Sequence, residues 1–105
     1  MDTSTNRLLM ELEQQMRTVN RDTLNPAFPE LCVNDFHAVA QMVANARESY
    51  LSELFAMGEA TQGKIPSNEM ISMLRQKREC FDELVAAAQA LEAATQRGYL
   101  DVSSS

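Results

Sequence analysis

Three side chains in this chain have the chemistry of nucleophiles or soft metal ligands: Cys32, His37 and Cys80. Cys32 and His37 stand five residues apart around the expected start of a helix, where a thiol can be activated by the local positive potential. The pair suggests a small thiol-dependent enzyme or redox protein, or half of a zinc site. This thiol chemistry is the alternative hypothesis for the function of the protein.

Most catalytic and metal sites lack the residues they need. His37 is the only histidine, so one chain cannot supply two histidine ligands. The Glu-x-x-His motif of di-iron bundles is absent, because Asn34 stands three residues before His37. A glycine-rich phosphate loop and a Gly-x-Ser-x-Gly elbow are also missing. The sequence predicts a non-enzymatic protein with no catalytic residue, no metal and no cofactor.

Composition narrows the class of partner. Fifteen acidic and nine basic residues give a net charge of -6, which disfavours binding to nucleic acid or to anionic membranes. The longest nearly apolar stretch, 38–44, is far shorter than the roughly 20 residues that span a bilayer. The N-terminus carries an acid instead of the basic region of a secretory signal. We therefore expect one domain covering residues 1–105, located in the cytoplasm.

Hydrophobic periodicity predicts an all-α fold with three helices. Apolar residues recur at three- and four-residue spacing in each of them, over about 5–21, 34–61 and 67–97. Two prolines in 25–29 end the first helix and leave a linker over 22–33. The tail, 101–105, is expected to be flexible.

Capping residues mark the ends of the two long helices. Asn34 is the expected N-cap of the second helix, and Ser67 that of the third. Gly58 and Gly63 compete to end the second helix, and Gly63 is favoured. Gly98 is the expected C-cap glycine of the third helix.

The short connection 62–66 forces the two long helices into an antiparallel hairpin. Facing residues then have numbers that sum to roughly 130, given an equal rise per residue on both helices. Cys80 lies opposite Tyr50, roughly 27 Å from Cys32 at helical rise, so a shared disulfide or metal site is not expected. The same rule predicts ion pairs between Arg75, Lys77 or Arg78 and Glu48, Glu53 or Glu59, although Glu53 is expected off the apolar stripe of its helix. Alternatively, the basic residues set the register of an antiparallel dimer or select an acidic partner.

The turn end of the hairpin is rich in apolar residues, including several methionines. Two helices alone cannot bury this much apolar surface between themselves, and the first helix, at about 27 Å, is too short to reach it. The predicted partner-binding residues are Leu54, Phe55, Met57, Ile65, Met70, Ile71, Met73 and Leu74.

Three occupants of this apolar end are possible: a shifted first helix of the same chain, a second copy in a homodimer, or a helical client protein. We expect a helical protein–protein interaction module, such as an adaptor, a regulator or a chaperone-like binder. Its architecture is a long antiparallel hairpin with a shorter N-terminal helix.

Overall fold

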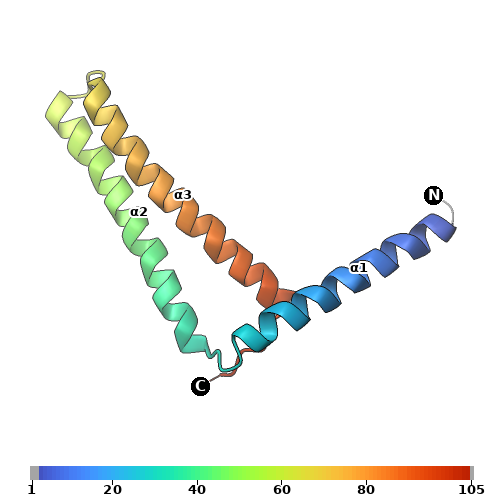
Figure 1. Ribbon diagram of the computed structural model, residues 1–105. Coiled ribbons are helices and arrows are strands. Elements are labelled where there is room, and N and C mark those ends of the chain that lie inside the picture. Colours follow the sequence, from blue (N-terminus) through green and yellow to red (C-terminus); the bar gives the residue numbers. More distant parts are fainter. Residues whose placement is uncertain (1–2, 105) are drawn as a thin grey trace. The chain divides into compact units, whose positions relative to one another are not determined.

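The computed structural model describes residues 3–104 and divides the chain into two compact units. One unit is the hairpin, 35–90, and the other combines the chain up to Asn34 with the chain from Leu91 onward. The main elements are α1 (Thr3–Leu24), α2 (Val33–Thr61) and α3 (Asn68–Gln96), with a short 3-10 helix, η1 (Asn25–Ala27), after α1 (Figure 1). The predicted all-α fold, with two long helices and a shorter N-terminal one, is confirmed.

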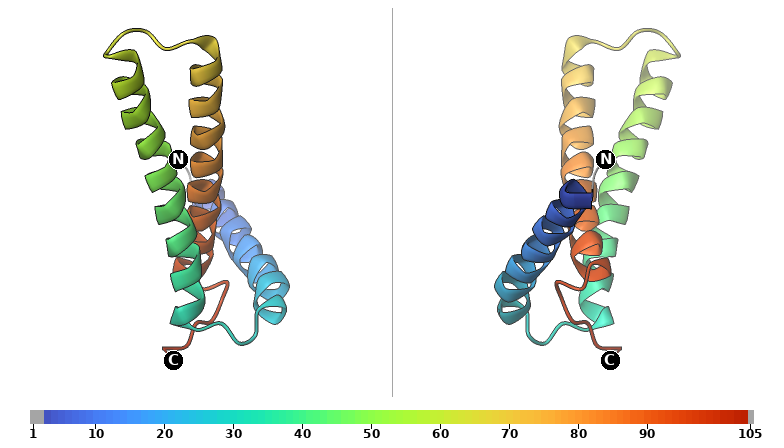
Figure 2. Two further views of the ribbon diagram at one scale, coloured as in Figure 1. Left: turned by 90° about the vertical axis from the view of Figure 1, so that its left-hand side faces the viewer. Right: turned by 90° about the vertical axis from the view of Figure 1, so that its right-hand side faces the viewer.

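In the hairpin unit, α2 and α3 run side by side and are joined at one end by the turn (Figure 2). Side chains that are at least half-buried recur at alternating three- and four-residue spacing on both helices, as in the contact line of a two-stranded coiled coil. We call this line the seam. Its members are Phe36, Val39, Val43, Ala46, Tyr50, Glu53 and Met57 on α2, and Met70, Leu74, Lys77, Phe81, Leu84 and Ala88 on α3.

Two contacts define the register of the seam. Lys77 Nζ lies 3.5 Å from Glu53 Oε2, and the ring centroids of Tyr50 and Phe81 are 6.1 Å apart. The residue numbers in these pairs sum to 130 and 131, so the predicted register is confirmed. The placement of Glu53 off the apolar stripe is wrong, because Lys77 provides a cationic partner for it within the seam.

The end of α2 lies where the sequence predicts it, but the residue that ends it differs. Gln62, with φ of 55°, takes the left-handed conformation directly after the helix, and Gly63 follows with φ of 81°. The Gly63 N–H donates to the Gly58 carbonyl at 3.1 Å and the Gln62 N–H donates to the Glu59 carbonyl at 3.2 Å, which is a Schellman motif. Gln62, rather than Gly63, therefore occupies the position that normally favours glycine.

Both predicted caps of α3 are confirmed. The Ser67 hydroxyl oxygen accepts a hydrogen bond from the Met70 N–H at 3.2 Å, as an N-cap does. At the other end Gly98 has φ of 77°, and the Tyr99 N–H donates to the Ala94 carbonyl at 2.9 Å. Serine and glycine thus satisfy backbone groups that the helix itself leaves without partners.

In the other unit, α1 continues to Leu24, three residues beyond its predicted end. Its 22 residues span about 33 Å instead of about 27 Å. Pro26 follows within η1, where a fixed φ and a missing N–H are tolerated. The linker is therefore partly helical, because proline suits the first positions of a helical turn as well as an extended segment.

The C-terminal tail pairs with the linker ahead of α2. The Val33 N–H donates to the Ser103 carbonyl and the Ser103 N–H donates to the Leu31 carbonyl, both at 3.0 Å. This pairing is a parallel bridge between Cys32 and Ser103. The helix α2 begins at Val33, so Asn34 lies inside its first turn and is not the N-cap. Ser103, in the tail predicted to be flexible, is thus hydrogen-bonded on both its N–H and its carbonyl, and Ser105 lies outside the described residues.

An arginine holds the tail against the end of α1. Arg21 donates to the Gly98 carbonyl at 2.6 Å and to both carboxylate oxygens of Asp101, at 3.3 and 2.8 Å. The Asp101 N–H donates to Asn25 Oδ1 at 3.2 Å. Hydrogen bonds from Arg21, and then its charge, hold the pKa of Asp101 below its ordinary value. Between these polar contacts Leu100 is buried, with 6% of its surface exposed.

Candidate protein-interaction surface at the hairpin tip

The hairpin tip is the end of α2, the turn and the start of α3, and it holds all eight predicted partner-binding residues. Three of them face the seam, because Met57 is only 5% exposed and Met70 and Leu74 are half-buried. The other five are exposed. Their exposed fractions are 48% for Leu54, 74% for Phe55, 94% for Ile65, 38% for Ile71 and 47% for Met73.

Helical geometry explains this division. Met57 follows Tyr50 by seven residues, or about two turns, so both side chains face α3. Phe55 precedes Met57 by two residues, which rotates its side chain by about 200° away from that direction. The turn residue Ile65 lies outside both helices and contributes nothing to the seam. The predicted set is thus partly hairpin core and partly outer surface.

The exposed apolar surface also includes Leu51, which is not among the predicted partner-binding residues. Its side chain is 44% exposed and stands three and four residues before Leu54 and Phe55. This i, i+3, i+4 spacing places the three side chains on one face of α2. The spacing is readable in the sequence, but only the position of the seam shows that this face points outward.

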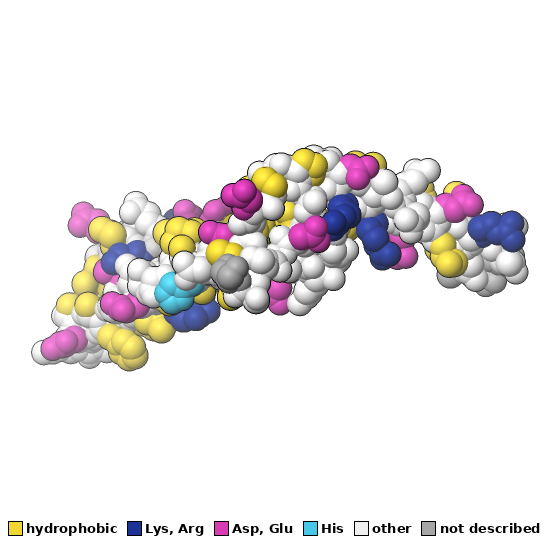
Figure 3. Space-filling view, turned by 90° about the horizontal axis from the view of Figure 1, so that it is seen from below, with side chains coloured by type: hydrophobic (Ala, Val, Ile, Leu, Met, Phe, Trp, Pro, Cys, Tyr) yellow, Lys and Arg dark blue, Asp and Glu magenta, His cyan; other side chains and the backbone are white. Residues whose placement is uncertain are grey.

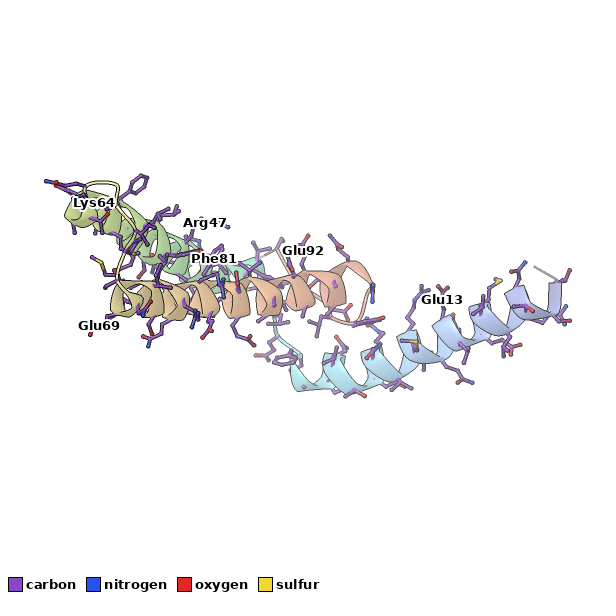
Figure 4. The ribbon with its side chains drawn as sticks, turned by 90° about the horizontal axis from the view of Figure 1, so that it is seen from above. Glu13, Arg47, Lys64, Glu69, Phe81 and Glu92 are labelled. Carbon is purple, nitrogen blue, oxygen red and sulfur yellow. The ribbon has the colours of Figure 1, made fainter. Side chains whose placement is uncertain are left out.

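Arginines border the apolar side chains on one side of the hairpin. A shallow groove of about 140 Å³ is lined by Tyr50, Ile71, Leu74, Arg75 and Arg78. The Arg47 guanidinium lies 5.1 Å from the centre of the Phe81 ring, a cation–π distance, and Figure 4 labels both residues on the two arms. This side of the hairpin therefore combines apolar contact area with donors that can bind carboxylates.

The residues of the alternative thiol hypothesis lie in different units. Cys32 is half-buried beside the bridge to Ser103, whereas His37 is exposed on α2 and is visible as the cyan side chain in Figure 3. Cys80 is exposed on α3. Within residues 3–104, no three His, Cys, Asp or Glu side chains are grouped so that they could hold a metal ion.

A second apolar face lies on α1. No described side chain of this helix is buried; Leu24 at its end is half-buried, and six other large apolar residues are between 48% and 69% exposed. They are Leu8, Leu9, Met10, Leu12, Met16 and Val19. All except Met10 follow the three- and four-residue spacing of an amphipathic stripe. The sequence predicts this stripe, and none of its side chains is buried within its own unit.

No helix among the described residues is both long and apolar enough to cross a membrane. Comparison with known proteins yields no match, whether with protein-family models, with curated proteins or with solved structures.

Proposed function

We propose that this protein is a non-enzymatic helical module that binds another protein chain through the hairpin tip. The observation that carries the proposal is the exposure of large apolar side chains there, led by Phe55 at 74% and Ile65 at 94%. Exposed apolar side chains grouped on one surface are typical of protein interaction sites.

A second copy of the chain is the partner we favour. Two helices bury apolar residues along a single line, and two hairpins together form a four-helix core that buries a second face of each helix. Most soluble oligomers are symmetric dimers in which the same patch serves both chains. A helical client protein would use the same surface, and the flexible side chain of Met73 would suit either occupant.

Exposed residues are the right ones to change in a test. Leu51→Glu with Phe55→Glu places two charges on the outer surface and leaves the seam intact. Met70→Glu or Leu74→Glu would instead place an unpaired charge in the seam and destabilise the hairpin, so a lost dimer could not be assigned to the interface. The matched control is Met42→Glu, because Met42 is also on α2 and 49% exposed, but lies about 20 Å along the helix from Phe55.

The measurement is molar mass by light scattering across a concentration series. The wild type and Met42→Glu should approach twice the chain mass of 11.7 kDa, and the double variant should remain at one chain mass with unchanged helicity. If the double variant dimerises as strongly as the wild type, the tip is not the interface.

The proposal includes a cytoplasmic location and no nucleic-acid partner. An exposed thiol such as Cys80 suits a reducing compartment, and a net charge of -6 opposes binding to phosphates. Fractionation of the native cell and a binding assay with duplex DNA and RNA test these two points.

A further inference from the structure

We propose that the tip surface binds the α1 helix of a second copy, along the side of the hairpin that carries arginines. This inference rests on the proposed function and names the segment of the partner that occupies the surface. We call this side the arginine flank. It consists of Arg47, Leu51 and Leu54 on α2, and Ile71, Arg75 and Arg78 on α3.

Spacing and contacts place the two halves of the arginine flank on one side of the hairpin. Arg47, Leu51 and Leu54 follow one another at four and three residues, and so do Ile71, Arg75 and Arg78. Both sets of residues lie next to the seam, displaced from it in the same direction of rotation about their own helix axes. When two helices run antiparallel, residues displaced in this way lie on the same side of the pair. The groove lined by Tyr50 together with Ile71, Arg75 and Arg78 is located there.

The arginines have charge to offer a partner. Among residues 3–104, Arg47 and Arg75 form no ion pair. Arg78 has only a long contact, with Nε 3.9 Å from Asp82 Oδ2, and both side chains are more than half exposed. Exposed pairs of this kind contribute little stability, so Arg78 can exchange its partner at low cost. The flank therefore favours an apolar segment that carries carboxylates.

The α1 helix has this combination. Leu12 is central in its apolar stripe, and Glu11 and Glu13 project about 100° to either side of Leu12. Arg7 and Arg17 lie farther round, toward the back of the helix. Neither Glu11 nor Glu13 forms an ion pair with another described residue, and Figure 4 labels Glu13 on α1. The stripe is thus bordered by acids on both edges.

The lengths also agree. The stripe from Leu8 to Val19 covers eleven residue steps, or about 17 Å, and the flank from Arg47 to Leu54 on α2 covers seven steps, or about 11 Å. One α1 helix is therefore long enough to cover the exposed apolar residues of the flank. In a two-fold dimer each chain gives one α1 and receives another, so the contact occurs twice and the assembly closes.

Two full-length charge-reversal variants test this arrangement. One carries Arg75→Glu and Arg78→Glu on the flank, and the other carries Glu11→Arg and Glu13→Arg on α1. In a dimer of either variant alone, α1 and the flank that it meets carry charges of the same sign, and this repulsion occurs in both copies of the contact. Their equimolar mixture restores opposite charges in both contacts, because the unchanged α1 of the first variant meets the unchanged flank of the second, and the two reversed surfaces meet each other.

Sedimentation velocity gives the dissociation constant in each case. We expect each variant alone to dimerise at least about tenfold more weakly than the wild type, and the mixture to recover to within about threefold of it. The matched control carries Gln41→Glu, Asn45→Glu, Gln76→Glu and Ala86→Glu, which together change the net charge by -4, as the flank variant does, at exposed positions outside the flank and α1. This control should dimerise as the wild type does.

Two results would overturn the inference. One is a mixture that dimerises no better than its components, and the other is a pair of variants that each dimerise as the wild type does. If in either case Leu51→Glu with Phe55→Glu still abolishes dimerisation, the tip remains the interface and only the assignment of α1 fails. If that variant also dimerises normally, the proposed function fails as well.

Discussion

Lys77 and Glu53 form an ion pair across the hairpin seam, with Lys77 Nζ 3.5 Å from Glu53 Oε2, whereas the flanking seam residues are apolar or aromatic. Their side chains are 33% and 25% exposed, so each has lost much of its hydration. A shift of either helix by one turn would leave two poorly hydrated charges without partners. The pair therefore selects the register, whether or not it adds stability.

Replacing the ion pair with leucines tests this role. Lys77→Leu or Glu53→Leu alone should lower the free energy of unfolding, because each leaves one charge in the seam. The double variant should be as stable as the wild type or more so. We expect a coupling of about 1 kcal/mol between the two positions from urea unfolding in a double-mutant cycle. Additive effects of the single changes would show that the pair does not interact.

Gln62, in the turn, has a strained backbone conformation that replacement with glycine should relieve. This residue has φ of 55° immediately after α2, and a side chain disfavours that conformation. Gln62→Gly should raise the free energy of unfolding by about 0.5–1 kcal/mol. Gly98 occupies the equivalent position after α3 with φ of 77°, and an added Cβ would meet no atom within 4 Å.

Gly98→Ala is therefore the matched opposite change, and it should lower stability by about 1 kcal/mol through backbone strain alone. Thermal and urea unfolding measure both variants. If Gln62→Gly and Gly98→Ala change stability in the same direction, the left-handed conformation is not the cause.

Ser67 caps α3 through its side chain. Ser67→Ala removes the acceptor of the Met70 N–H and should cost about 1 kcal/mol, whereas Ser67→Asp should retain the cap. Ser72→Ala is the control, because Ser72 is exposed within α3, where alanine is a good helix former. Urea unfolding compares the three variants, and equal effects at both serines would contradict the capping role.

The contact between Arg21 and Asp101 predicts a dependence of stability on pH. The pKa of Asp101 in the folded protein is lower than its ordinary value of 3.8, so ionised Asp101 stabilises the fold at pH values above 3.8. This contribution is lost as the pH falls below 3.8 and through the folded-state pKa. Asp101→Asn should therefore lose less stability than the wild type over that range.

A titration followed by nuclear magnetic resonance checks the cause. The pKa of Asp101 should rise toward its ordinary value in Arg21→Gln, because that change removes both the hydrogen bonds and the charge. An Asp101 carboxyl that titrates identically in the wild type and in Arg21→Gln would contradict the assignment.

Much of the hairpin could be predicted because its determinants are local. Ser67 and Gly98 act on the backbone within a few residues, and the short turn leaves one possible register. The errors arose where distant residues intervene. Asn34 is not the cap of α2, because the helix begins one residue earlier, at Val33, whose N–H donates to Ser103 far along the chain. The apolar pattern of α2 does not place Glu53 in the seam, because its partner Lys77 comes from the other helix.

The sequence by itself determined three helices, the antiparallel direction of the hairpin and the residue pairs that face each other, because spacing, caps and turn length act over short ranges. Only the tertiary structure decided which apolar tip residues form the seam. Met57 is buried and Phe55 is exposed although they are two residues apart, because the rotation of α2 about its axis is set by packing against α3. The same packing leaves Leu51, Leu54 and Phe55 on the outside, where another chain can bury them.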